Sequence, residues 1–173
     1  MSIKNKEHQP KDIKKSIKEW GLSFLFAFIL VQILKVYVFG FALVEGPSME
    51  NTIQDGDRVL VVKFLQPKKG DVVVVENSKG SKLIKRVIGT EGDKVEIKDG
   101  ELFLNRKKQK ENYIKEPMTK NNFKEVTVPK GEIFVMGDNR NISADSRFYG
   151  TFDLKEHYTG RVVMEYMNNL KFY

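Results

Sequence analysis

The chain contains no cysteine and only two histidines, His8 and His157. Without cysteine there are no disulfide bonds, no thiol catalysis and no cysteine-based metal site. Two histidines are too few for a multi-histidine metal site, so we expect neither a metal nor another cofactor. If the protein is an enzyme, its chemistry has to come from hydroxyl, amine or carboxylate groups.

Acidic residues are fewer than basic ones, but the excess is unevenly spread. The 173 residues carry a net charge of +7, and the first 19 hold six lysines against three acidic side chains. The remaining residues are only mildly basic and show no zinc-ligand spacing or aromatic-interleaved basic motif, so we expect no nucleic-acid partner. The length allows one domain with a small appendage, and an apolar content of 40% is enough for a core.

The longest apolar run covers residues 20–44, WGLSFLFAFILVQILKVYVFGFALV, in which Lys35 is the only charge. Its first part is rich in Leu, Phe, Ile and Ala, as in lipid-facing helices, whereas VYVFGFALV favours a strand. A membrane-spanning helix needs about 20 apolar residues. We therefore predict a transmembrane anchor at residues 17–37, with Trp20 near one interface and Lys35 extending toward the other.

The positive-inside rule sets the expected topology. The basic residues 1–16 would stay in the cytoplasm, and residues 38–173 would form an extracytoplasmic domain anchored by one span in the plasma membrane. A cleaved signal peptide is an alternative, although the apolar run is long and no A-x-A site follows it closely. A buried core helix is the other alternative.

Beyond residue 45, short β-branched and aromatic runs alternate with turn residues. The dipeptide Asp99-Gly100 between two such runs is a strong hairpin signal. This spacing predicts a mostly β domain, an antiparallel barrel or a pair of sheets, with residues 94–130 as a smaller hairpin region. Residues 105–124 are polar and lysine-rich, and we expect an exposed excursion there. The runs that predict strands are 58–63, 71–76, 82–88, 95–98, 101–104, 126–128, 133–136 and 160–166.

Two kinds of serine chemistry are open to this composition. A Ser-His-Asp triad needs a histidine on the same side of the membrane as its serine, which leaves only His157, in a stretch (LKEHY) that predicts an exposed surface turn. A serine can instead be activated by a neutral lysine amine. Lys85, in the apolar run LIKRVI, and Ser48, after Gly-Pro, are candidates. The residues alone favour a strand-edge lysine with its amine in water and an ordinary turn serine.

Four stretches together resemble, in order, the characteristic boxes of type I signal peptidases, also called leader peptidases. They are GPSMENTI (46–53), GDVVVV (70–75), KRVIGTEGD (85–93) and GDNRNISADSRFYG (137–150). The resemblance implies a membrane-anchored serine endopeptidase with a mostly β, signal-peptidase-like ectodomain and no metal. It would cleave signal peptides from secreted precursor proteins after small residues. Gly46, where some members carry a second serine, resembles the Gram-positive branch.

The resemblance also implies roles for individual residues. Ser48 would be the nucleophile, Lys85 the general base and Ser143 the hydroxyl that orients the lysine. Asp145 and Arg147 would buttress the site, and residues 138–140 would complete their loop. The lining of the substrate pockets would be Val44, Met49, Ile53, Leu83 and Ile84.

The chemistry requires Lys85 to lose its proton near neutral pH. Burial lowers a lysine pKa, and we expect Leu83, Val87 and Met49 to supply that burial, with Arg86 adding a like charge. The sequence departs from the family pattern at Asn51, where proline is usual, at Leu154, and at Asn141 and Ile142. Two other functions remain: a Ser-Lys autoprotease of the repressor-cleavage kind, and an inactive membrane-tethered homologue that serves as a binding module.

Overall fold

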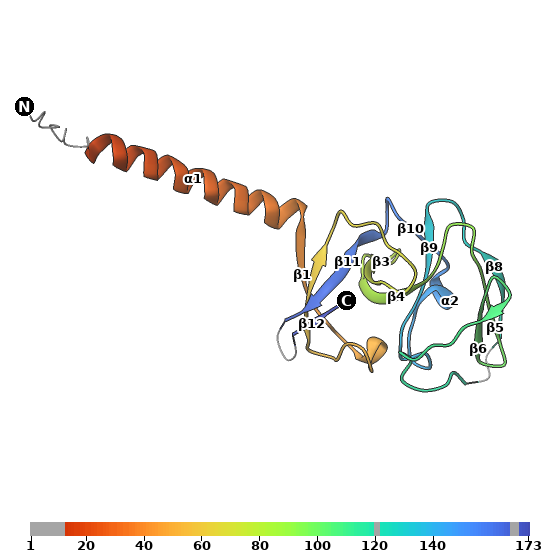
Figure 1. Ribbon diagram of the computed structural model, residues 1–173. Coiled ribbons are helices and arrows are strands. Elements are labelled where there is room, and N and C mark those ends of the chain that lie inside the picture. Colours follow the sequence, from red (N-terminus) through yellow and green to blue (C-terminus); the bar gives the residue numbers. More distant parts are fainter. Residues whose placement is uncertain (1–12, 120–121, 167–169) are drawn as a thin grey trace, which may run out of the picture. The chain divides into compact units, whose positions relative to one another are not determined.

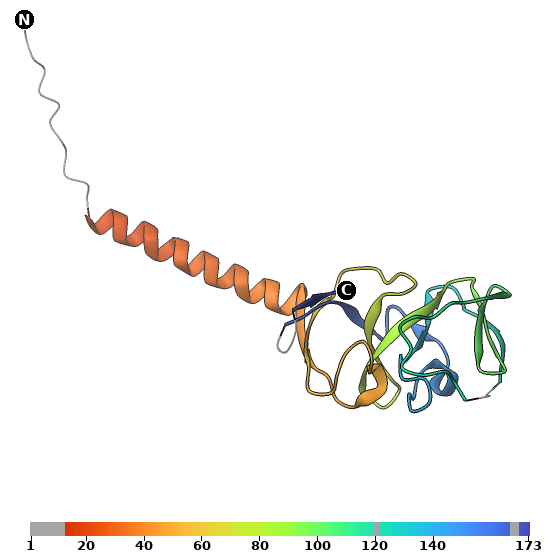
Figure 2. The ribbon, with the colours of Figure 1, turned by 60° about the horizontal axis from the view of Figure 1, so that its bottom comes forward.

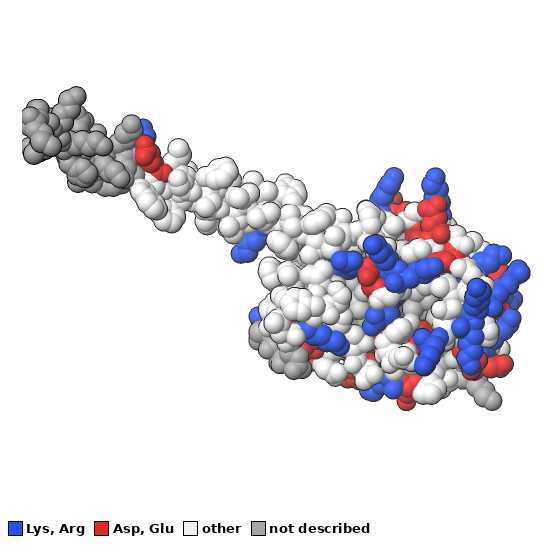
Figure 3. Space-filling model, in the orientation of Figure 1, with Lys and Arg blue, Asp and Glu red and all other residues white. Residues whose placement is uncertain are grey.

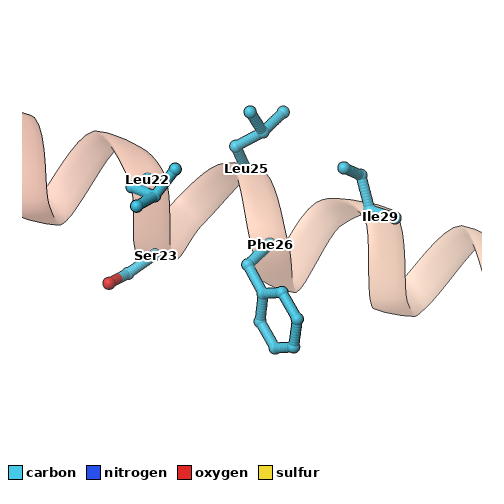
Figure 4. A pocket seen from close by; sticks show the side chains of 5 residues that line it. All are labelled: Leu22, Ser23, Leu25, Phe26 and Ile29. Carbon is cyan, nitrogen blue, oxygen red and sulfur yellow. The ribbon is translucent and has the colours of Figure 1, made fainter.

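The computed structural model describes residues 13–119, 122–166 and 170–173, in two units that divide after Tyr37 (Figure 1). The first unit is the helix α1, Ile13–Tyr37. Among the described residues it is the one helix long and apolar enough to cross a membrane, over Lys18–Tyr37. Its large apolar side chains are exposed, as lipid-facing side chains would be. A shallow hollow on its surface is lined by Leu22, Ser23, Leu25, Phe26 and Ile29 (Figure 4).

The second unit is built on two antiparallel sheets, which confirms the mostly β prediction. The larger sheet has the order β1-β2-β11-β3-β4-β9-β10, with β12 paired to β11. Its strands are β1 Phe39–Leu43, β2 Arg58–Val62, β3 Val72–Glu76, β4 Lys82–Thr90, β9 Glu132–Met136, β10 Phe152–Asp153, β11 Tyr158–Glu165 and β12 Lys171–Phe172. Figure 2 shows this unit from a second side.

The smaller sheet has the order β7-β6-β5-β8, with β5 Lys94–Lys98, β6 Glu101–Leu104, β7 Lys107–Lys108 and β8 Phe123–Thr127. The predicted hairpin is confirmed, because Lys98 pairs with Glu101 across Asp99 and Gly100. Both turn residues have positive φ, 49° and 79°, as a type I′ turn requires.

Strand β3 explains the GDVVVV box. Its four valines are all buried, but they face two different clusters because neighbouring side chains in a strand point to opposite faces. Val72 and Val74 pack with Val44, Met49 and Ile53, while Val73 and Val75 pack with a second group that includes Val87 and Val135. A strand covered on both faces therefore reads as a continuous apolar run.

The expectation for residues 105–124 was wrong in part. Met118 is buried, and Glu111 and Tyr113 are half-buried, although the residues around them are mostly exposed. The three residues lie in a mostly polar stretch that shows no apolar periodicity, so the sequence does not predict their burial.

Candidate active site

Ser48 lies in a 3-10 turn, η1, Pro47–Met49. Gly46 enters the turn at φ 86°, a conformation that favours glycine, and Pro47 suits the first helical position. Met49 is fully buried and anchors the turn, whereas Ser48 remains partly accessible. Asn51 has φ 77°, which asparagine tolerates and proline cannot adopt. The departure from the family pattern at this position therefore goes with a different local backbone.

Lys85 extends from β4 to this turn. Its Nζ lies 2.7 Å from Ser48 Oγ and 2.9 Å from the carbonyl oxygen of Ile84. Only 3% of the residue is exposed. Burial lowers the pKa of Lys85 from 10.5 to about 8, against the carboxylates of Asp145 and Asp138, which raise it. The amine and the hydroxyl are thus in contact in a site that favours the neutral amine.

Arg86 has a different role from the one expected. The guanidinium that lowers the pKa of Lys85 is that of Arg147. Arg86 donates to both carboxylate oxygens of the buried Asp138, over 2.9 and 2.6 Å, and to the carbonyl of Gly70. Its charge is neutralised within the protein, while its position next to Lys85 holds Asp138 close to the site.

The loop at 137–147 packs directly on the nucleophile turn. The amide of Asn139 donates to the carbonyl of Ser48 over 3.0 Å. A Cβ added to Gly137 would come within 2.5 Å of that same carbonyl and 2.3 Å of Ser143 Oγ. Only glycine allows this approach. Ser143 Oγ is buried and has no hydrogen-bond partner among the described residues.

Asp145 and Arg147 lie at the C-terminal end of this loop. Asp145 is fully buried, accepts a hydrogen bond from the amide of Gly137 and caps the short helix α2, Ser146–Tyr149. Arg147 binds both of its carboxylate oxygens, over 2.9 and 2.8 Å. The pair holds the loop that carries Ser143, and its two charges act on Lys85 in opposite directions.

The structure brings together four of the five candidate pocket residues. Val44, Met49 and Ile53 form one cluster, against which Ile84 packs. Leu83 packs against the other cluster, because adjacent residues of β4 face opposite sides of the sheet. Val44, Met49, Ile53 and Ile84 therefore share one face of β4, and Leu83 lies on the other.

His157 is half-buried rather than exposed, with its ring 6.2 Å from that of Phe152. Sequence reasoning assigned no role to Thr52, Glu111 or Tyr113. Thr52 donates to Asp138, and Glu111 and Tyr113 contact Arg140 and Arg86. The one signal for the last two is an aromatic residue and a carboxylate close together in a lysine-rich stretch.

The sequence of this chain is similar to those of known proteins. A family model described as signal peptidase, peptidase S26, matches residues 17–167. A signal peptidase I of Bacillus licheniformis is 37% identical over 155 residues, covering 82% of this chain and 83% of that protein. A signal peptidase IB of Staphylococcus aureus is 35% identical over 175 aligned positions, covering 89% and 91%. A crystal structure of a signal peptidase I from Enterococcus faecalis is 28% identical, with a TM-score of 0.48, and covers 56% of this chain and 97% of that one.

Proposed function

This chain belongs to the signal peptidase family, peptidase S26, and we propose that it cleaves signal peptides with Ser48 as nucleophile and Lys85 as general base. It is a serine endopeptidase that acts on precursors bearing signal peptides. The observation that carries the two roles is the distance of 2.7 Å between Ser48 Oγ and the Nζ of a buried lysine. With a pKa of about 8, about one lysine in ten is neutral at pH 7.

The reaction follows from these two groups. Ser48 Oγ attacks the scissile carbonyl while Lys85 Nζ accepts its proton. The developing oxyanion is held by main-chain N–H groups, chiefly that of Ser48, because N–H groups in the first turn of a helix lack partners within it. Lys85 then gives the proton to the leaving amine, and water hydrolyses the acyl-enzyme. No step requires a metal or a cofactor.

An extended substrate fits the free edge of β4. Strand β9 pairs with β4 only from Arg86 onward, so no described strand pairs with Lys82–Ile84 on the side opposite β3. The end of a signal peptide would add here as a further strand. Small side chains before the cut would lie over the apolar floor of Val44, Met49, Ile53 and Ile84, and Leu83 would support the strand from behind.

The support residues act on the lysine and on its loop. We assign Asp145 and Arg147 to holding the 137–147 loop in place, and Ser143 to orienting the amine when substrate binds. Its buried, unpartnered hydroxyl supports this role. Asp138 holds Arg86 next to Lys85.

We place α1 in the plasma membrane as a single anchor, with residues 1–16 in the cytoplasm and residues 38–173 on the extracellular face. The lysine-rich start of the chain supports this orientation. A nucleophile shortly after the anchor meets the scissile bond at the outer face of the bilayer, where signal peptides end. Tethering both partners to one membrane raises their effective concentration.

The test uses the full chain in detergent with a secretory precursor. We expect cleavage after a small residue by the native chain and none by Ser48→Ala. Cleavage that survives Ser48→Ala would overturn the proposed nucleophile. A native chain that binds the precursor without cutting it would favour the binding module, and a chain that cuts only itself would favour the autoprotease.

A further inference from the structure

The described part of the chain buries a further pair of charges, Arg140 and Glu111, that the reaction does not use. Arg140 is 1% exposed, and its two terminal nitrogens donate to Glu111 over 2.7 and 2.6 Å. The Glu111 side chain is 6% exposed. Burial acts against the charge of Arg140, but Glu111 outweighs it and raises the pKa of the guanidinium. A buried ion pair contributes little net stability, because desolvation offsets the attraction between the charges. Stability alone therefore does not account for this pair.

Tyr113 joins this pair to Arg86. Its hydroxyl donates to Glu111 Oε1 over 2.7 Å, and its ring centroid lies 4.3 Å from Cζ of Arg86 and 5.7 Å from Cζ of Arg140. A guanidinium within about 6 Å of an aromatic centroid is attracted to the ring. Tyr113 therefore contacts two guanidiniums, that of Arg86 in β4 and that of Arg140 in the 137–147 loop. We call residues 109–119, which carry Glu111 and Tyr113, the strap.

The strap is connected to both members of the dyad. Arg140 Nε donates to the carbonyl of Gly137 over 2.9 Å. In the same loop, Asn139 donates from its amide to the carbonyl of Ser48 and from its side chain to that of Pro47, over 3.0 and 3.2 Å. On the other side, Arg86 is the chain neighbour of Lys85. The amide of Lys115 adds a third contact, to the carbonyl of Asp138 over 3.0 Å.

We propose that Glu111 and Tyr113 are positioning residues of the peptidase: they hold Arg140 and Arg86, and through them keep the Ser48 main chain and Lys85 in register. The inference rests on the proposed roles of Ser48 and Lys85. Neither strap residue contacts the reacting atoms. Their effect comes from geometry, since a displacement of about 1 Å in a catalytic group can lower a rate by on the order of a hundredfold.

The test compares Glu111→Gln, Glu111→Asp and Glu101→Gln in the full chain in detergent. Glu111→Gln removes the carboxylate at nearly constant shape, and we expect kcat to fall by on the order of tenfold or more with KM within about twofold. Glu111→Asp keeps the charge and should restore part of kcat. Glu101 pairs with Lys108 on the exposed surface of the smaller sheet and is the matched control.

A second measurement does not depend on catalysis. Amide exchange in residues 137–142 should accelerate in Glu111→Gln and not in Glu101→Gln, since the amide of Asn139 bonds to Ser48. Faster exchange at this loop with native kcat would overturn the positioning role, as would a lower melting temperature with native kcat in the folded variant. If the native chain cleaves nothing, the proposed function fails, whereas the exchange result still tests the strap's hold on the loop.

Should Glu111→Gln not fold, Tyr113 decides the question. Tyr113→Phe keeps the ring against both guanidiniums and loses one hydroxyl, whereas Tyr113→Leu loses both contacts. We expect kcat to decrease in the order native, Tyr113→Phe, Tyr113→Leu, with KM little changed. Equal kcat in the two variants would contradict the role of the ring.

Discussion

The charged residues around Ser48 and Lys85 and a charged pair on the smaller sheet differ in how deeply they are buried. Five charged residues in β4 of the larger sheet and in the loop next to it are each less than a tenth exposed: Lys85, Arg86, Asp138, Arg140 and Asp145. On the smaller sheet, the side chains of the pair Lys108–Glu101 are 59% and 48% exposed. Figure 3 shows the charged groups that reach the surface in one view. Burying a charge costs several kcal/mol, while an exposed pair contributes about 0–1 kcal/mol. The charges gathered around Ser48 and Lys85 are therefore buried, whereas the Lys108–Glu101 pair stays in water.

The largest expected effect comes from removing the buried amine itself. Lys85→Met should lower cleavage at least about a thousandfold, because Ser48 loses its base. It should also stabilise the fold at pH 7, since a shift from 10.5 to about 8 means that burial of the protonated lysine costs about 3 kcal/mol. Initial rates and the melting temperature of the full chain in detergent check both effects. A lower melting temperature of Lys85→Met than of the native chain would show instead that the buried lysine stabilises the fold.

The next effect concerns a buried charge that loses its partner. Asp138→Asn leaves Arg86 buried beside a neutral amide, which should lower the free energy of unfolding by about 3–5 kcal/mol. Denaturant unfolding of the full chain measures it. Thr52, which donates to Asp138, gives a milder variant for comparison, Thr52→Val. If Asp138→Asn costs no more than an exposed pair would, the distinction between the two sheets fails.

The pH dependence of cleavage tests the state of the amine. Because the active form of Lys85 is the neutral one, the rate should rise about tenfold per pH unit below its pKa of about 8 and level off above it. Stability should follow the same group: between pH 8 and 10.5 the unfolded chain binds more protons, so the Lys85 contribution to the free energy of unfolding rises with pH. A rate optimum near pH 5 would contradict a neutral-amine base.

Most strands of the two sheets could be predicted from the sequence because their signals are local. The valine run of β3, the Asp99-Gly100 turn and the change from helix-favouring to strand-favouring residues before β1 each lie within a few residues. The opposite facing of Leu83 and Ile84 was also predictable, since alternation along a strand requires it. Ser48 and Lys85 were identified through the family boxes. Composition and spacing alone did not distinguish them from an ordinary turn serine and a strand-edge lysine.

The strap could not be predicted because its partners are distant in sequence. Glu111 meets Arg140 across 29 residues, and nothing local distinguishes it from an exposed glutamate in a lysine-rich stretch. The sequence also could not predict that Arg147, rather than Arg86, lowers the pKa of Lys85. Arg86 is adjacent to Lys85 in β4, but its guanidinium faces Asp138. Sequence neighbours reveal which charges are available, whereas the fold decides which of them face each other.

The smallest effect is expected for the exposed ion pair on the smaller sheet, which is the counterpart of the buried pairs. Glu101→Gln makes the same chemical change as Glu111→Gln, from a carboxylate to an amide. The partner of Glu101, Lys108, remains hydrated when the pair is lost. We expect a change in the free energy of unfolding below about 0.5–1 kcal/mol, which salt reduces further. Denaturant titrations at low and high salt measure it. A loss above about 2 kcal/mol would mean that the smaller sheet depends on its charges too, and that burial alone does not separate the two sheets.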